Sequence, residues 1–308
     1  MRDRLRLPDG VLGMASRGPQ WAAFVDRLPG VVQSLYDDWE LRPDGWMMHG
    51  YCALVVPVVT SGGRRRVLKV ALQDEESEHE HLALSRWGGD GAVRMDRADP
   101  ARGALLLEQL RDVSLEAAWD VEACTVVGEL YGRLHVPAPG QLRPLTAFVE
   151  RWADELAALP RSAPLPRRLV EQAVSLSRDF CADGASVGTM IHGDLHYGNV
   201  LAADREPWLA IDPKPVSGDP HYEPAPMLWN RWNELVSSPL GVRDAVRRRF
   251  HTLVDTASLD EDRARDWVVV RMLDNAAWRL LDPPTGQQGM TEDEWLTVCI
   301  TIAKAVQD

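Results

Sequence analysis

A short segment of the chain concentrates polar side chains that could bind a metal ion and activate a hydroxyl group. The segment runs from Met190 to Asp212, and its polar residues stand between two apolar stretches. Asp194 and Asn199 are five residues apart, so one turn could direct both side chains to a shared site. Asp212 follows on the second arm of an expected hairpin. A polar turn explains any one of these residues, but the whole set of hard oxygen donors suits Mg²⁺ with bound phosphate.

The same segment contains two histidines that suggest a different chemistry. His192 and His196 stand on either side of Asp194 and could be the metal ligands of a hydrolase. That interpretation gives no role to Asn199, or to Lys69, a lysine that lies on an expected strand earlier in the chain. We therefore expect both histidines to be structural and to hydrogen-bond the backbone of the loop.

Two kinds of secondary structure are expected to position these residues. Apolar stretches separated by turns predict a small antiparallel sheet with one inserted helix over residues 40–110. The expected strands are 46–59, 66–72, 92–95 and 104–108, and the inserted helix is 74–87. Helical periodicity predicts further helices at 17–39 (interrupted at Pro29-Gly30), 114–135, 145–158, 165–183, 221–237, 241–256, 260–281 and 291–306. The change of pattern predicts two lobes, residues 1–111 and 112–308.

Composition excludes several classes of protein. The chain has 308 residues, of which 45% are hydrophobic and 26% charged, so it can bury a core and is not disordered. Its net charge of -12 argues against nucleic-acid binding and could attract a cationic small molecule. We interpret the basic run 247–249 as an exposed helix face. We expect a monomer or a weak homodimer.

We also expect a cytoplasmic protein that does not enter a membrane. No apolar run reaches the roughly 18 residues that span a membrane, and Met1 to Gly10 lacks the apolar core of a signal peptide. The cysteines are far apart and form no CxxC pair, which predicts free thiols in a reducing compartment. They are Cys52, Cys124, Cys181 and Cys299.

Lysine is rare in this chain. Only three of the 34 basic residues are lysines, namely Lys69, Lys214 and Lys304. A lysine retained in such a composition is a candidate for a role that arginine would perform poorly. Lys69 lies in an expected strand, and Lys304 is expected to be a solvated charge. Lys214 follows Asp212-Pro213 and is either a surface residue or a group near phosphate or substrate.

The polar segment resembles the catalytic segment of a known family. His192-Gly193-Asp194-Leu195-His196-x-x-Asn199, followed by Ile211-Asp212-Pro213, is similar to the motifs of aminoglycoside phosphotransferases. The run from Glu206 to Pro213, then Gly218-Asp219-Pro220, looks most like streptomycin 6-phosphotransferases and hydroxyurea phosphotransferases. The resemblance implies an α+β, bilobal protein-kinase-like fold. A small antiparallel sheet would form the N-lobe, helices most of the C-lobe, and the nucleotide would bind between them.

The resemblance also assigns roles by position. Asp194 would be the catalytic base, Asn199 and Asp212 the Mg²⁺ ligands, and Lys69 the lysine that binds the α- and β-phosphates of ATP, with GTP left open. Glu80 would pair with Lys69, with Glu76 and Glu78 as alternatives. The hinge around Glu108 and Leu110 would bind adenine, and Gly50 would lie in the nucleotide loop. The nucleotide loop lacks the G-x-G-x-x-G of protein kinases. Gly193 and Pro213 replace the arginine and phenylalanine of the protein-kinase motifs, which implies a constitutively active enzyme.

A further group of residues falls where this family builds its acceptor site. It consists of Asp219, Tyr222, Glu223 and Glu234. Carboxylates there would suit the guanidinium groups of a streptomycin-like acceptor, although a solvated helix N-terminus explains Asp219 and Glu223 nearly as well.

These observations predict an ATP-dependent O-phosphotransferase that acts on a hydroxyl of a small molecule, with an aminoglycoside such as streptomycin as the acceptor. One alternative is a kinase for hydroxyurea or another hydroxylated metabolite. Another is a non-catalytic nucleotide-binding module. The retention of Lys69, Asp194, Asn199 and Asp212 argues against the latter.

Overall fold

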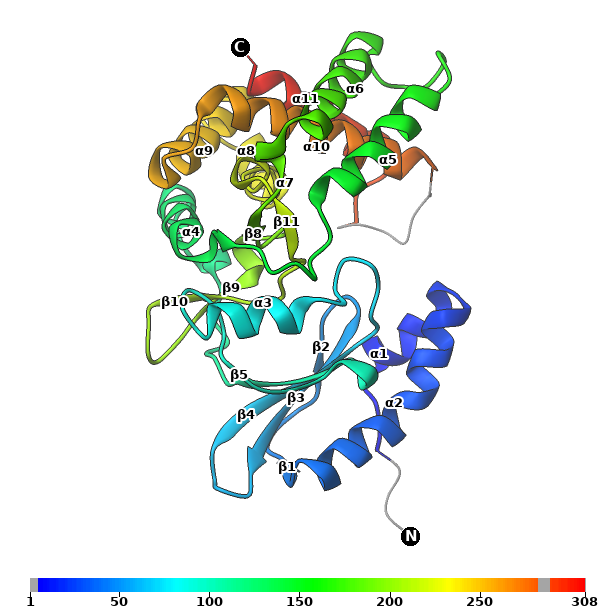
Figure 1. The fold of residues 1–308 in the computed structure, drawn as a ribbon, viewed down its shortest axis with the longest axis vertical. Coiled ribbons are helices and arrows are strands. Elements are labelled where there is room, and N and C mark those ends of the chain that lie inside the picture. The colour runs from blue at the N-terminus through cyan, green and yellow to red at the C-terminus, as the bar shows by residue number, and fades with distance from the viewer. Residues whose placement is uncertain (1–4, 282–288, 308) are drawn as a thin grey trace. The chain divides into compact units, whose positions relative to one another are not determined.

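The computed structural model describes residues 5–281 and 289–307, and Figure 1 shows its helices and strands. The chain forms two compact units, Met1–Arg111 and Asp112–Asp308. Residues 1–4, which belong to the segment Met1 to Gly10, lie outside the described residues.

The first unit is built on a six-stranded antiparallel sheet. Its strand order is β1-β3-β4-β6-β5, and β2 pairs with β3. The strands are β1 Leu41–Pro43, β2 Met48–His49, β3 Ala53–Thr60, β4 Arg65–Ala71, β5 Met95–Asp99 and β6 Ala104–Glu108. The expected strand 46–59 is therefore two strands, because a turn at Gly50 separates them: its N–H donates to the Ala53 carbonyl at 3.0 Å. The strand expected at 92–95 begins only at Met95 and continues to Asp99 as a polar edge strand. Ala92 and Val93, which suggested the strand, are buried just before it.

The two faces of this sheet differ because side chains alternate along a strand. On one face, Leu54, Val56, Leu68 and Val70 form a core with α2, Pro19–Asp38. Helix α1 (Asp9–Gly13) and the 3₁₀ helix Met14–Arg17 extend this core. Lys69 lies between Leu68 and Val70 and therefore faces the other side, which α3, Glu80–Trp87, covers (Figure 1).

Two expected helices of this unit have different limits. Helix α2 is continuous through Pro29, because burial of Leu28 and Val32 against the sheet stabilises the helix beyond its local propensity. Helix α3 begins only at Glu80. The residues before it form turns in which the Asp74 carboxylate accepts from the backbone N–H groups of Glu76 and Ser77.

The second unit is mostly helical. Its helices are α4 Asp120–Leu134, α5 Leu145–Ala158, α6 Arg167–Ala182, α7 Ala225–Trp229, α8 Trp232–Val236, α9 Val242–Ala257, α10 Glu261–Leu281 and α11 Glu292–Ala305. Its strands are β7 Val136–Pro137, β8 Thr189–Ile191, β9 Val200–Ala202, β10 Trp208–Ala210 and β11 Val216–Gly218. Strand β8 pairs with β7 and β11, and β9 and β10 form the expected antiparallel hairpin.

The helix expected at 221–237 is broken in the structure. A 3₁₀ turn, Pro220–Tyr222, precedes α7, and Arg231 adopts a left-handed conformation (φ 54°) between α7 and α8. At the break the Asn230 carbonyl accepts a hydrogen bond from the Arg249 guanidinium at 2.6 Å. A long-range contact therefore overrides the local helical pattern.

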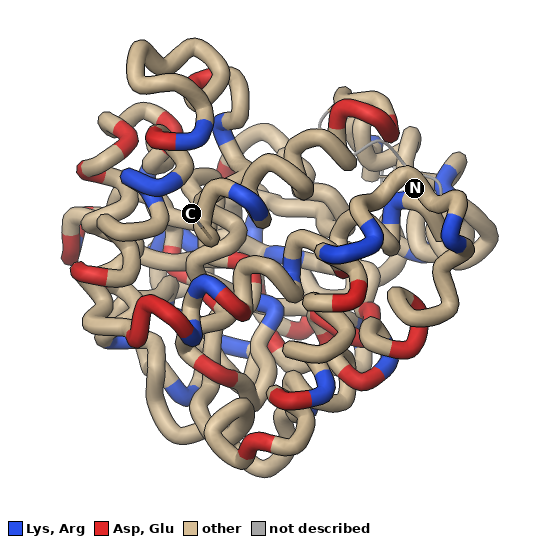
Figure 2. Tube along the Cα trace, turned by 90° about the horizontal axis from the view of Figure 1, so that it is seen from above, with Lys and Arg blue, Asp and Glu red and all other residues tan. Residues whose placement is uncertain are grey.

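The helices, the charged residues and the cysteines bear on further expectations. None of the helices in the described ranges is long and apolar enough to cross a membrane. Figure 2 shows basic residues interspersed with acidic ones along the trace. The four cysteines are free thiols, as predicted.

Candidate active site

A buried ion pair occupies the face of the first sheet that α3 covers. The Nζ atom of Lys69 lies 2.7 Å from both Oε atoms of Glu80, and both residues are buried. Glu80 is thus the partner of Lys69 among the three glutamates considered. A buried cation is costly unless it is paired and hydrogen-bonded, so the pair fixes the ammonium group at one place on β4.

Three further residues of the first unit were expected to contact a nucleotide. The Gly50 backbone faces open space, since a Cβ there would have no atom within 4 Å. The N–H of Glu108 donates to the Arg94 carbonyl, and the Glu108 carboxylate accepts from the Arg94 N–H. The backbone N–H of Glu108 is thus already bonded within the sheet. Leu110 is half-buried beyond the end of β6.

In the second unit, the loop after β8 carries Asp194. His192 is fully buried, and its Nε2 lies 3.0 Å from the Ile211 carbonyl while its Nδ1 accepts from the Asp194 N–H. This pattern requires the proton on Nε2. Burial lowers the pKa of His192, so the ring stays neutral and fixes the loop. His196 likewise accepts from the Gly198 N–H at 3.1 Å.

These contacts favour a structural role for both histidines over the metallohydrolase. Each histidine bonds the loop backbone, as predicted.

The backbone of the same loop is held from two sides. Gly193 has φ +80°, and a Cβ there would lie 2.3 Å from the Lys214 carbonyl oxygen. Arg271 donates to the Gly193 carbonyl at 2.5 Å. The Glu223 carboxylate accepts from the N–H groups of His192, at 2.5 Å, and of Gly193. Only glycine fits this approach without displacing the neighbouring backbone.

Asp194 is partly exposed, and Lys214 and Asn199 contact it in addition to His192. Lys214 Nζ lies 3.2 Å from Asp194 Oδ2. The Asn199 side-chain amide donates to the Asp194 carbonyl at 2.8 Å, so the Oδ1 atom of Asn199 is the one that could bind a cation. The β9–β10 hairpin brings Asp212 near Asn199, because the Ile211 N–H donates to the Asn199 carbonyl. Asp212 itself has φ +57°.

The oxygen atoms of Asn199 and Asp212 fit a magnesium site. Mg²⁺ is typically held by one or two protein oxygens together with substrate phosphates and water, and not by a cage of protein ligands. Two hard donors at the end of one hairpin match that requirement.

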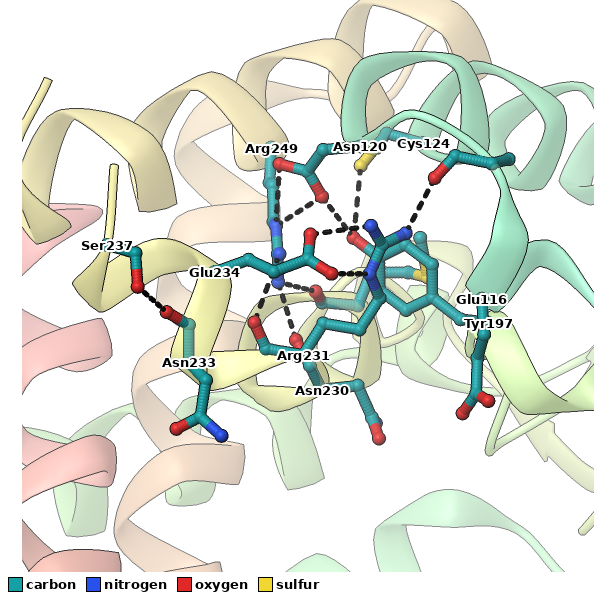
Figure 3. A network of polar contacts seen from close by, with 12 residues as sticks. Glu116, Asp120, Cys124, Tyr197, Asn230, Arg231, Asn233, Glu234, Ser237 and Arg249 are labelled. Atoms are coloured by element: carbon teal, nitrogen blue, oxygen red, sulfur yellow. Dashed lines mark hydrogen bonds and ion pairs between the residues drawn. The ribbon is translucent and has the colours of Figure 1, made fainter. Parts of the chain in front are cut away.

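A polar network that was not predicted from the sequence supports this loop (Figure 3). Tyr197, fully buried in the loop, donates to Asp120 at 2.6 Å. Arg249 also binds Asp120, at 2.8 Å, and donates to the Asn230 carbonyl at 2.6 Å. The interpretation of 247–249 as exposed is thus wrong for Arg249. Its spacing of four from the buried Ala245 on α9 was the available signal.

Three of the four expected acceptor residues, Asp219, Tyr222 and Glu223, are buried. Asp219 is 1% exposed and accepts from Arg263 and Trp267 at 2.6 and 2.7 Å. Burial raises its pKa, but the hydrogen bonds from His221 and Trp267 outweigh burial and leave the pKa lowered. Glu223 is fully buried and accepts from the backbone N–H of His192.

The other two acceptor candidates differ from each other. The ring of the buried Tyr222 packs beneath the Arg271 guanidinium, 4.1 Å away. Glu234 is exposed on α8, but Arg231 binds its carboxylate at 2.5 and 2.7 Å (Figure 3). An acceptor that used Glu234 would therefore have to compete with Arg231.

The fold and these side chains define a small-molecule kinase of the protein-kinase-like class. A thermostable mutant of an aminoglycoside phosphotransferase, solved with ADP and hygromycin B, superposes with a TM-score of 0.59 at 16% identity. The match covers 90% of this chain and 98% of that one. The family model for aminoglycoside/hydroxyurea antibiotic resistance kinases matches residues 38–282, and the chain belongs to this family.

Two relatives show the same relation at the level of sequence. The chain is 41% identical over 273 residues to a streptomycin 6-kinase of Streptomyces glaucescens, covering 86% of this chain and 87% of the relative. It is 38% identical over 292 residues to a hydroxyurea phosphotransferase of Kitasatospora aureofaciens, covering 92% and 81%.

Proposed function

We propose that this protein is an ATP-dependent kinase that phosphorylates a hydroxyl group of an aminoglycoside such as streptomycin. The observation that carries the proposal is the loop at Asp194, which is fixed through its backbone while its carboxylate stays partly exposed. The identity to a streptomycin 6-kinase names the class of acceptor. Residues 1–111 would form the nucleotide-binding lobe, and residues 112–308 would carry the catalytic loop and the acceptor site.

The residues would divide the reaction between them. Lys69, fixed by Glu80, would bind oxygens of the α- and β-phosphates. Asn199 and Asp212 would hold Mg²⁺, which neutralises phosphate charge when bound. Asp194 would orient the acceptor hydroxyl and take its proton as the oxygen–phosphorus bond forms. The bond from the γ-phosphorus to the ADP oxygen breaks in the same transfer.

A direct assay tests this function. Purified protein would be supplied with Mg²⁺ and ATP, and ADP release measured with streptomycin, other aminoglycosides, hydroxyurea, simple sugars and amino alcohols. We expect turnover with streptomycin and a product heavier by one phosphoryl group. Asp194→Asn should fold normally and lose at least about a hundredfold in kcat. Near-wild-type turnover by that variant would contradict the assigned base.

Hydroxyurea is the second candidate acceptor. It is favoured by the 38% identity to a hydroxyurea phosphotransferase over 92% of this chain. The ratio of kcat/KM for streptomycin and hydroxyurea decides between the two, and replacing ATP by GTP decides the donor. Thermal stabilisation by nucleotide without transfer to any acceptor would instead indicate a non-catalytic nucleotide-binding module.

A further inference from the structure

Two of the three lysines of this chain lie beside groups with proposed roles in the reaction. Lys69 is the buried partner of Glu80, whereas Lys214 binds Asp194 and its side chain is 42% exposed. An ion pair this exposed contributes little to stability, typically about 0–1 kcal/mol. The main physical consequence of Lys214 is therefore a positive charge held against the carboxylate that would act as the base.

The backbone around Lys214 fixes where that charge lies. The Lys214 N–H donates to the His192 carbonyl at 2.8 Å, and its carbonyl oxygen lies against Gly193. Prolines precede and follow it, at positions 213 and 215, and each restricts the local backbone. Lys214 is thus attached to the residues immediately before Asp194, so the ammonium group and the carboxylate form one preorganised unit.

A lysine in this place leaves one carboxylate oxygen for the reaction. Its ammonium contacts Oδ2 of Asp194. A guanidinium presents a fork of donors that tends to bind both oxygens of a carboxylate at once. The chain has 31 arginines among its 34 basic residues, and the need to leave one oxygen of Asp194 uncovered explains why a lysine stands at this position. With a lysine there, Oδ1 stays available to accept a proton from a hydroxyl.

We propose that Lys214 is a further catalytic residue that contacts the transferring phosphoryl group, an inference that rests on the proposed function. In the resting enzyme it holds Asp194 Oδ2. As the acceptor hydroxyl gives its proton to Oδ1, the acceptor oxygen bonds to the γ-phosphorus and the bond to ADP breaks. Lys214 then donates to an oxygen of the phosphoryl group. Charge on that group is met by a donor already in place.

Substitution of Lys214 gives the kinetic test. Lys214→Met should lower kcat about 100- to 1,000-fold, the usual effect of removing one such donor, with KM for ATP and the melting temperature nearly unchanged. Lys214→Arg keeps the charge but engages both oxygens, so it should recover only part of the loss. Lys304→Met, which removes an exposed lysine from α11, is the matched control and should leave kcat unchanged.

A binding measurement separates this role from a structural one. Calorimetry with AMP-PNP should give the same Kd for the wild type and Lys214→Met. ADP with aluminium fluoride, which mimics the transferring phosphoryl group, should bind the variant at least about tenfold more weakly in the presence of acceptor. If the wild type is active and kcat of Lys214→Met lies within threefold of it, this inference alone is overturned. The same holds if Lys214→Met loses affinity for AMP-PNP and for ADP with aluminium fluoride to the same extent. Absence of phosphate transfer by the wild type would overturn the proposed function as well.

Discussion

Substitution of Gly193 by alanine would test whether the close approach of two backbone segments sets the geometry at Asp194. Gly193 has φ +80°, and a Cβ there would lie 2.3 Å from the Lys214 carbonyl oxygen. Left-handed backbone costs an L-residue about 1–2 kcal/mol, and forcing the extra atom into a packed place costs about 1–3 kcal/mol more. We therefore expect Gly193→Ala to lower the free energy of unfolding by about 2–5 kcal/mol.

The same substitution should also lower activity. An ordinary contact begins near 3.4 Å, so the Lys214 carbonyl must move by about 1 Å to admit the methyl group. That carbonyl belongs to the residue that binds Asp194, so both groups move. Misplacement of this size can cost on the order of a hundredfold in rate. Urea unfolding and kcat measured on the same preparations would report the two effects.

Two other glycines provide matched controls. Gly188 has φ +104° with no atom within 4 Å of a Cβ, so Gly188→Ala isolates the conformational cost of about 1–2 kcal/mol. Gly132 is exposed in α4 with open space around it, so Gly132→Ala should stabilise by roughly 0.5–1 kcal/mol. If Gly193→Ala proves no less stable than Gly188→Ala and keeps normal kcat, the contact with Lys214 does not constrain the loop.

Two further predictions concern buried groups. Glu80→Gln leaves the buried Lys69 without its anionic partner, so it should destabilise the first unit by about 3–5 kcal/mol and raise KM for ATP. Thermal melting and kinetics measure the two effects, with Glu78→Gln, at a partly exposed glutamate, as the control. Equal effects of the two variants would contradict the assignment of Glu80 as the partner of Lys69. Burial lowers the pKa of His192, so the unfolded chain binds a proton at this residue more readily than the folded one. The stability that the neutral ring contributes should therefore fall as the pH drops below about 6.5. Urea unfolding from pH 8 to 5 should show that the free energy of unfolding depends less on pH in His192→Gln than in the wild type. An identical pH dependence in both proteins would refute the effect.

The local motifs of the site could be predicted from the sequence because they depend on neighbours along the chain. Alternation along β4 places Lys69 on the face opposite the core, and the β9–β10 hairpin brings Asn199 and Asp212 together. The structural roles of His192 and His196 followed from the same local pattern. Asn199 follows Asp194 by five residues and Asp212 follows Asn199 by thirteen, and such short separations along the chain are enough to fix these relations.

Burial and long-range pairing could not be predicted in this way. Asp219, Glu223 and Arg249 are polar residues on segments that look exposed, yet all three are buried. Each becomes an internal hydrogen-bond partner because a distant element packs against it, such as the Trp267 side chain of α10 against Asp219. Packing of this kind also breaks the helix expected at 221–237.

The sequence by itself therefore determined the family and predicted the roles of the loop at Asp194 and of Lys69, since these predictions rest on short motifs and strand periodicity. Only the tertiary structure decided that Glu80 pairs with Lys69, that Glu223 holds the backbone before Asp194, and that Lys214 binds Asp194. The physical reason is that a charged side chain takes its partner from whatever the fold brings within reach, and one sequence without its fold leaves several partners possible.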